Sequence, residues 1–375
     1  MASQDISGQQ LAIGTRKGLL TYQESSGQWS ISSESHLGAR VSYSMRDTRS
    51  GLLFACLDHG HWGAKLQRSA DAGKTWEEIP APQYPEGAEL KDGKPAVLRY
   101  QWCLAQGAAD HPGRLYLGTE PGGLFVSDND GDSFELVESL WNHESRKEMW
   151  MGGGLDEPGV HSVLVDPRDP RKITVGISVA GVFATTDGGE TWRPSNTGLK
   201  ADFLPNPDVE IGHDPHLVVR CAAQPDVLWQ QNHCGIFRST DGAANWTRVS
   251  EPGQESGTDG AAFGTAHFGF AIVVDPQDGD TCWVIPAVSD EVRIAIDRQL
   301  CVCRTTDGGQ TWVAFRNGLP QEDCYDFAFR HNLDLCGDRL VFGTACGSLY
   351  FSDDRGESWR VLANHLPPIY SVRFI

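Results

Sequence analysis

The sequence of 375 residues has little positive charge: 31 lysine and arginine residues stand against 50 aspartate and glutamate residues, a formal net charge of −19. This excess of negative charge disfavours nucleic acids and anionic membranes as partners, because both repel an acidic surface. Long apolar runs are also missing, and the first ten residues, MASQDISGQQ, are polar. We therefore expect no membrane-spanning segment, no targeting segment and no membrane partner.

Cysteine pairs of the C-x-x-C type are absent, although the chain contains ten cysteines. Most of these cysteines fall in or beside apolar segments, where a thiol behaves as a small hydrophobic side chain. Together with the absence of a secretory leader, this pattern predicts reduced thiols and a cytoplasmic location.

A helical period is missing as well, since no long window repeats apolar residues every 3.6 positions. Runs of four to eight residues rich in Val, Ile, Leu and Phe, separated by Gly and Asp, instead indicate β-strands. Between these runs one octapeptide pattern recurs, Ser/Thr-x-Asp-x-Gly-x-Thr/Ser-Trp. Its copies are SADAGKTW (Ser69 to Trp76), SDNDGDSF (Ser127 to Phe134), TTDGGETW (Thr185 to Trp192), STDGAANW (Ser239 to Trp246), TTDGGQTW (Thr305 to Trp312) and SDDRGESW (Ser352 to Trp359).

Each octapeptide has the residues of a tight turn between two strands. The Asp carboxylate can accept hydrogen bonds from turn N–H groups, and the Gly can adopt a positive φ. The aromatic residues that end the octapeptides lie 47 to 66 residues apart, and a degenerate copy, TYQESSGQW (Thr21 to Trp29), makes seven units. A repeat of this length predicts a propeller, with four antiparallel strands in each blade.

We therefore expect an all-β fold, a seven-bladed β-propeller that occupies residues 1–375 as one domain. The chain begins at the second strand of a blade, with Leu11 to Tyr22, and ends with an additional first strand, Ile369 to Ile375. The C-terminal strand is thus expected to join the N-terminal blade, which would close the ring and remove its exposed edge.

The octapeptides resemble the Asp-box of the sialidase-like, or BNR, β-propellers. Further stretches resemble bacterial single-domain proteins labelled BNR-repeat glycosyl hydrolase or exo-α-sialidase, among them GTRKGL (Gly14 to Leu19), DEPGVHSV (Asp156 to Val163), DPHLV (Asp214 to Val218) and SDEVR (Ser289 to Arg293). The resemblance implies a propeller and raises a glycosidase as an activity. It also raises a non-catalytic alternative, because some seven-bladed Asp-box propellers, such as photosystem assembly factors, are binding platforms.

The long connections are expected on the face away from the octapeptide turns, which we call the top face. The octapeptides join the third and fourth strands of each blade, whereas the longest segments join one blade to the next. Long loops on one rim of a rigid scaffold commonly carry function. Ten of the twelve histidines map to the top face, and only His111 and His331 are expected on the opposite one.

Histidines at the starts of innermost strands could hold a metal at the central mouth. Imidazole-rich sites suit transition metals, and we expect one ion, zinc or iron. The candidate ligands are His59, His61, His161, His216 and His267.

Carboxylates and aromatic residues of the same face complete the predicted site. Candidate catalytic residues, as general base or orienting groups, are Glu157, Asp290 and Tyr325. Candidate ligand-binding residues are Trp62, Arg99, Glu120, His233, Arg293 and Asp323. A true sialidase is disfavoured, because the Arg-Ile-Pro motif of that family is absent and no arginine triad can be assigned by motif.

These observations favour an enzyme: a hydrolase-like, metal-assisted protein that binds a small polar or sugar-like ligand at the top-face mouth. A protein that uses the same rim as a non-catalytic platform for another protein is the first alternative. A glycosidase without the sialidase arginine triad is the second, since glycoside hydrolysis requires paired carboxylates.

Overall fold

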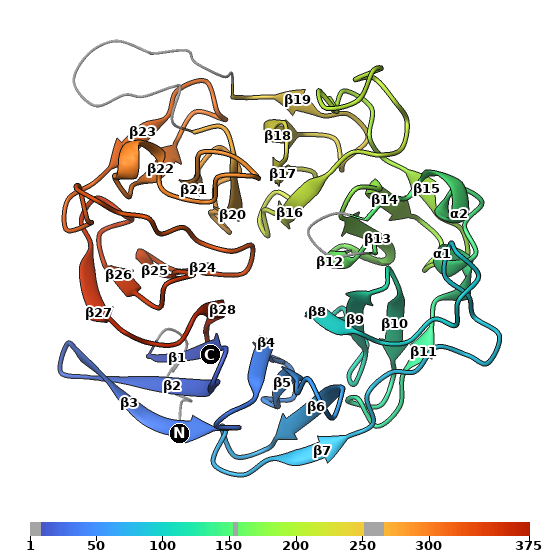
Figure 1. Cartoon of the computed structure of the whole chain (residues 1–375), viewed down its shortest axis with the longest axis horizontal. Coiled ribbons are helices and arrows are strands. Elements are labelled where there is room, and N and C mark those ends of the chain that lie inside the picture. Colours follow the sequence, from blue (N-terminus) through green and yellow to red (C-terminus); the bar gives the residue numbers. More distant parts are fainter. Residues whose placement is uncertain (1–8, 153–156, 251–265) are drawn as a thin grey trace.

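Seven four-stranded antiparallel sheets form a closed ring, as the sequence repeat predicts (Figure 1). The computed structural model describes residues 9–152, 157–250 and 266–375. Each sheet is one blade, and its first strand lies nearest the central axis (Figure 1). The prediction of an all-β seven-bladed β-propeller is therefore confirmed.

The first four blades each run from an innermost strand at the axis to an outermost strand at the rim. In that order, blade 1 contains β28 (Ile369–Phe374), β1 (Gln10–Thr15), β2 (Gly18–Ser25) and β3 (Gln28–Ser35); blade 2 contains β4 (Arg40–Arg46), β5 (Leu53–Asp58), β6 (Ala64–Ser69) and β7 (Glu77–Ile79); blade 3 contains β8 (Tyr100–Gln106), β9 (Leu115–Glu120), β10 (Leu124–Ser127) and β11 (Glu135–Leu136); blade 4 contains β12 (Val160–Asp166), β13 (Asp169–Ile177), β14 (Gly181–Thr185) and β15 (Arg193–Pro194).

The remaining blades follow the same order. Blade 5 contains β16 (Pro215–Arg220), β17 (Leu228–Asn232), β18 (Gly235–Ser239) and β19 (Thr247–Arg248); blade 6 contains β20 (Gly269–Val274), β21 (Cys282–Pro286), β22 (Val302–Thr305) and β23 (Val313–Phe315); blade 7 contains β24 (Leu333–Cys336), β25 (Arg339–Gly343), β26 (Leu349–Ser352) and β27 (Arg360–Ala363). Short helices α1 (Glu138–Trp141), α2 (Arg146–Met149) and η1 (Ile296–Arg298) lie in connections. Within the described residues, no helix combines the length and the apolar character needed to cross a bilayer.

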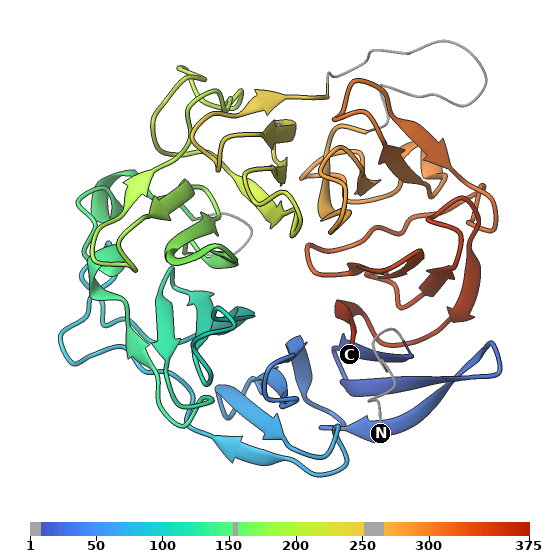
Figure 2. The ribbon, with the colours of Figure 1, turned by 180° about the vertical axis from the view of Figure 1, so that it is seen from behind.

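The last strand closes the ring. β28 pairs with β1 from Leu11 opposite Phe374 to Gly14 opposite Ser371, before a register shift at Thr15. Both ribbon views show this last strand, in red, beside the first strands, in blue (Figure 1, Figure 2). β1 therefore has hydrogen-bonded partners on both sides, and the predicted closure is confirmed.

The octapeptide turns have the hydrogen bonds that their residue types predict. In the turn of blade 4, Thr191 N and Oγ1 donate to the Asp187 carboxylate at 3.0 and 2.6 Å, and Gly189 N donates to Thr185 Oγ1 at 3.0 Å. The corresponding bonds occur in the other five turns, with Asn129 in the place of Asp in blade 3. The turns are thus held by local contacts and form part of the scaffold.

Aromatic side chains fill the spaces between blades. Phe54, Phe125 and Phe183 come from three consecutive blades, are fully buried and belong to one apolar cluster. Tryptophans of two turns also reach the preceding blade: Trp246 Nε1 donates to Ser195 O at 2.8 Å, and the corresponding atom of Trp312 donates to a carbonyl of blade 5 at 3.0 Å. Burial of these large rings ties each blade to its neighbour.

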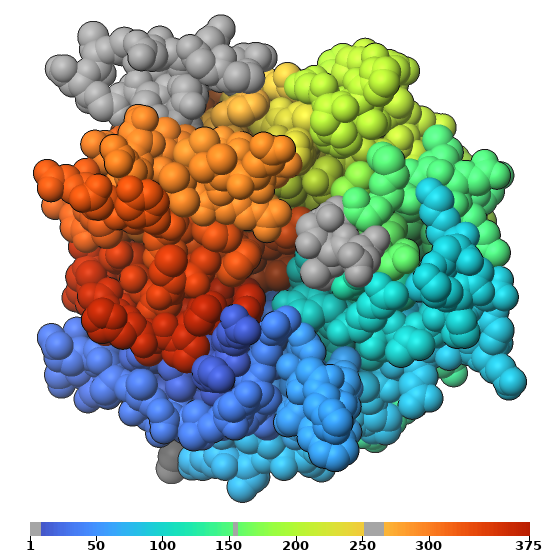
Figure 3. Space-filling model, viewed as in Figure 1, coloured from blue at the N-terminus to red at the C-terminus, as the bar shows by residue number. Residues whose placement is uncertain are grey.

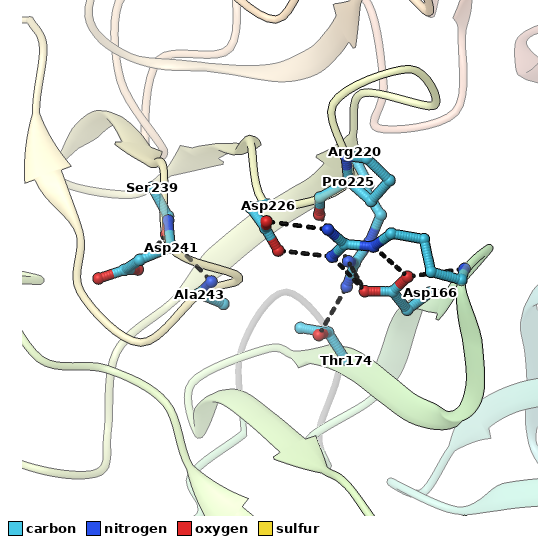
Figure 4. A network of polar contacts seen from close by, with 9 residues as sticks. Asp166, Thr174, Arg220, Pro225, Asp226, Ser239, Asp241 and Ala243 are labelled. Carbon is cyan, nitrogen blue, oxygen red and sulfur yellow. Dashed lines mark hydrogen bonds and ion pairs between the residues drawn. The ribbon is translucent and has the colours of Figure 1, made fainter.

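Charged residues on the octapeptide face pair with one another. Arg220 donates to Asp166 Oδ2 at 3.2 Å, to Thr174 Oγ1 at 3.1 Å and to Pro225 O at 2.7 Å, and Asp226 accepts a bond from a further arginine (Figure 4). The network joins blade 4 to blade 5. These groups border a surface hollow of 530 Å³, but their polar atoms contact one another, which indicates a structural role.

Candidate functional site

The top face has a hollow at the ring axis, where the innermost strands begin (Figure 3). Two adjoining cavities share the side chains of Arg293 and Arg330. The first, of 280 Å³, is lined by Arg40, Ser42, Asp58, Arg99, Tyr100, Trp102, Glu120, Arg293, Phe329, Arg330, His331 and Tyr370. The second, of 320 Å³, is lined by Gly152, Val179, Phe203, Asp214, His216, His233, Phe270, Asp290, Arg293 and Arg330. We call the two cavities together the mouth.

The first cavity is lined by four arginines and two carboxylates, so it is locally positive in an acidic protein. Arg40 pairs with Asp58 at 2.8 Å. Arg330 lies over the rings of Trp102 and Phe270, with its guanidinium carbon 5.1 and 5.5 Å from their centroids. Within residues 9–152, 157–250 and 266–375 Arg330 has no ion pair, and its buried Nε has no hydrogen-bond partner.

The positive charge of the Arg330 guanidinium is poorly balanced by the groups around it. Burial lowers the pKa of Arg330 to about 10, although the Asp214 carboxylate acts in the opposite direction. The side chain still carries its charge at neutral pH. Two aromatic faces stabilise a cation less than a carboxylate would, so this part of the mouth can accept an anion.

The second cavity contains one carboxylate between two imidazoles. Asp214, just before β16, directs Oδ2 to His216 Nε2 at 3.5 Å and to His233 Nδ1 at 3.6 Å. The other carboxylate oxygen, Oδ1, accepts a hydrogen bond from Val179 N at 3.1 Å. These three side chains form the one cluster of potential metal ligands that the described part of the chain contains.

The three groups differ in charge. Burial opposes ionisation of Asp214, but contacts with both imidazoles and the charge of Arg330 outweigh it, so the pKa of this carboxyl lies well below its usual range. Burial lowers the pKa of His216, which is neutral at pH 7. The Asp214 carboxylate raises the pKa of His233.

The structure brings six of the predicted site residues to the mouth. Arg99, Glu120 and Arg293 line the first cavity, and His216, His233 and Asp290 line the second. Glu157 adjoins the first cavity, since its backbone N donates to Glu120 Oε1 at 3.3 Å.

The other predicted residues lie elsewhere. Trp62, His59 and His61 are exposed in the connection between β5 and β6 of blade 2, where Trp62 lines a separate surface hollow of 720 Å³. Tyr325 and Asp323 are exposed beside Arg298. His161 is buried against Trp102 and Ser162, and His267 is half-buried against Ser250. His59, His61, His161 and His267 are therefore outside the Asp214 cluster.

His331 lines the first cavity on the top face, so the prediction that placed it on the octapeptide face is wrong. Arg330 lines the same cavity and was not among the predicted site residues. β24 starts only at Leu333, so the two residues before it, rather than Tyr325, occupy the mouth. The signal was present in the FAFRHN stretch, which ends an apolar run with Arg330, His331 and Asn332. The strand start could not be located because β24 has only four residues.

Fold and site together define a seven-bladed β-propeller whose arginine-lined mouth is large enough for a small-molecule ligand. No family model matches the chain. Xyloglucanase Xgh74A of Acetivibrio thermocellus is 25% identical over 284 residues, which cover 70% of this chain and 32% of that protein. The oligoxyloglucan-reducing end-specific xyloglucanase of Emericella nidulans is 26% identical over 300 residues, which cover 78% of this chain and 30% of that protein.

Among solved structures, an ancestral GH74 enzyme superposes with a TM-score of 0.57 and 15% identity, over 85% of this chain and 38% of that one. This likeness concerns the fold. The chain spans about a third of the length of the curated relatives it matches. It is thus a seven-bladed β-propeller whose relatives include xyloglucanases.

Proposed function

We propose that the protein is a hydrolase that binds a small, polar or sugar-like ligand with an anionic group at the top-face mouth. The observation that carries this proposal is Arg330, a largely buried cation without an ion-pair partner in the described residues, in a cavity lined by three more arginines. A carboxylate or a similar anion of the ligand would supply the missing partner, and guanidinium groups suit such oxygens geometrically.

The rest of the cavity suits a sugar-like ring. Trp102 and Tyr370 supply aromatic surface, while Asp58 and Glu120 supply carboxylates within the same 280 Å³. That volume limits the ligand to a small molecule or the end of a longer one.

A glycosidase is the second candidate, favoured by two observations. Glycoside hydrolysis requires a pair of carboxyl groups, and Asp58 and Glu120 line one cavity. The curated relatives are named xyloglucanases. A neutral glucan, however, has no anionic group to pair with Arg330, so we propose an acidic sugar rather than xyloglucan as the ligand class.

Three further proposals rest on the sequence. The octapeptide turns support membership of the Asp-box, sialidase-like superfamily. Ten cysteines without a disulfide support a cytoplasmic location. The net charge of −19 supports the absence of nucleic acid and membrane partners.

The test compares two ligands that differ by one carboxylate, glucuronic acid and glucose, by isothermal titration calorimetry. One charge-assisted contact corresponds to about tenfold or more in affinity. We expect glucuronic acid to bind at least about tenfold more tightly than glucose, and Arg330→Met to remove the difference. Arg298→Met, which changes an arginine of the same face outside the mouth, is the matched control.

Turnover is measured with the α and β anomers of 4-nitrophenyl glucuronides. Hydrolysis that is lost in Glu120→Gln supports the glycosidase. Binding of glucuronic acid without any hydrolysis favours a non-catalytic protein that uses the mouth for binding alone. Equal binding of both sugars, or no binding of either, would overturn the proposed ligand class.

A further inference from the structure

We propose that Asp214, His216 and His233 bind a divalent transition metal ion, zinc or iron(II), beside the arginines of the mouth. Two imidazoles and one carboxylate are a donor set that these ions prefer. The inference does not depend on hydrolysis of any sugar, because it concerns the contacts of these three side chains.

The orientation of His216 is the first argument. Its Nδ1 lies 2.6 Å from Gly269 O, and a carbonyl oxygen can only accept, so Nδ1 carries a proton. That leaves Nε2, 3.5 Å from Asp214 Oδ2, as the ring nitrogen that can offer a lone pair to an ion held between the two atoms. A backbone carbonyl on the far nitrogen is also the usual partner of a metal-bound histidine.

The separations are the second argument. A hydrogen bond would bring the nitrogen and oxygen to about 2.7–3.2 Å, whereas Asp214 Oδ2 lies 3.5 Å from His216 Nε2 and 3.6 Å from His233 Nδ1. Bonds of about 2.0–2.1 Å to a tetrahedral ion separate neighbouring ligand atoms by about 3.4 Å. The observed distances match the edges of a coordination polyhedron better than they match direct hydrogen bonds.

The surroundings hold each ligand in place. Val179 N binds Asp214 Oδ1 at 3.1 Å and leaves Oδ2 available as a single ligand atom. The His216 ring stacks on Phe270 with centroids 4.6 Å apart. His233 N donates to Asp214 O at 2.9 Å, which fixes the turn that carries this imidazole.

Asp290 completes the arrangement around His233. If Nδ1 of this ring binds the ion, Nε2 carries the proton, and Asp290 Oδ2 lies 4.0 Å from it. That separation is too long for a hydrogen bond, so Asp290 places a negative charge beside the ring and is not one of the three ligands. Three protein ligands leave positions on the ion open to the 320 Å³ cavity, where a ligand oxygen or water could bind.

The experiment measures metal content and affinity directly. The whole protein is treated with a chelator, dialysed, and titrated with Zn²⁺ by calorimetry and with Co²⁺ by visible absorption. We expect one equivalent of either ion, with the intense visible bands of low-symmetry Co²⁺. Asp214→Asn and His233→Ala should each weaken Zn²⁺ binding by about 100-fold or more.

Two controls keep the result unambiguous. His59→Ala changes an exposed histidine outside the cluster and should bind Zn²⁺ as the native protein does. Asp214→Asn keeps the shape of the side chain, and circular dichroism reports whether each variant folds. A plain ion pair between Asp214 and protonated His233 would change stability without Zn²⁺ binding, and that outcome overturns the inference. Binding of glucuronic acid by a protein that takes up no Zn²⁺ would reject the metal site and retain the proposed function.

Discussion

Replacement of Gly198 by alanine tests how closely neighbouring blades approach each other. Gly198 has φ +88°, and a Cβ added there would lie 2.0 Å from Trp246 O. The same tryptophan donates its backbone N–H to Thr197 O at 2.8 Å. Blade 7 repeats the arrangement, since a Cβ at Gly318 would lie 1.8 Å from Trp359 O.

The cost can be worked out from two contributions. A non-glycine residue in the left-handed region costs about 1–2 kcal/mol. Restoring an ordinary carbon–oxygen contact requires a shift of more than about 1 Å, which breaks a hydrogen bond worth about 1 kcal/mol and unpacks an indole at about another 1–2 kcal/mol. Gly198→Ala should therefore lower the free energy of unfolding by about 3–5 kcal/mol.

Gly51→Ala separates the two contributions. Gly51 has φ +77°, and a Cβ added there meets no atom within 4 Å. It should cost only the conformational contribution, about 1–2 kcal/mol. Urea unfolding followed by tryptophan fluorescence measures both variants. Equal losses for Gly198→Ala and Gly51→Ala would refute the close approach of the blades.

The other predictions concern the ring, one buried carboxylate and one thiol. Deletion of residues 369–375 removes Ile369, Val372 and Ile375, which are at most 6% exposed; at about 1.5–3 kcal/mol each, their loss approaches the whole stability of a typical protein. The melting temperature should fall sharply, and an unchanged melt would contradict ring closure. Burial opposes ionisation of Asp166, but Arg168 and Arg220 hold its pKa at about 2. Because this value lies below that of the unfolded chain, the carboxylate stabilises the protein above about pH 4 and loses this effect as the pH falls towards 2. Asp166→Asn should thus cost on the order of 1 kcal/mol at pH 7, after allowance for solvent screening, and less near pH 2 in denaturant titrations; an equal cost at both would count against the ion pairs. Cys346 is exposed as a residue, but partial desolvation of its thiol and the Asp326 charge raise the pKa to about 11. Its alkylation by iodoacetamide, followed by mass spectrometry, should accelerate about tenfold per pH unit between pH 8 and 10, whereas a plateau by pH 9 would disprove the raised pKa.

The fold could be predicted from the sequence because the hydrogen bonds that define each turn join residues close together in the chain. Each octapeptide forms its turn with bonds among its own eight residues, as Thr185, Asp187 and Thr191 do. Seven such units at a regular period specify the number of blades. The additional apolar strand that begins at Ile369 was likewise expected to pair with the free edge of β1.

The site could be predicted only in part. Strand order assigned Arg99, Glu120, Arg293, His216, His233 and Asp290 to the top face, and all six line the mouth. The sequence did not show which of these side chains contact one another. Asp214 precedes β16 and His233 follows β17, so both lie at the open end of this hairpin, and their approach depends on the register of the two strands.

The sequence by itself determined the seven blades, their turns, the ring closure and the face that carries the long connections, because short-range hydrogen bonds and apolar periodicity encode them. Only the tertiary structure decided that Arg330 rather than Tyr325 reaches the axis, and that His216 and His233 converge on Asp214 while His59 and His61 do not. The physical reason is that the cavity of Arg330 is built from separate blades, whereas Asp214, His216 and His233 meet within blade 5 through the register of β16 and β17. The geometry of the mouth depends on where each inner strand starts, and a shift of a few residues moves a side chain into or out of the mouth.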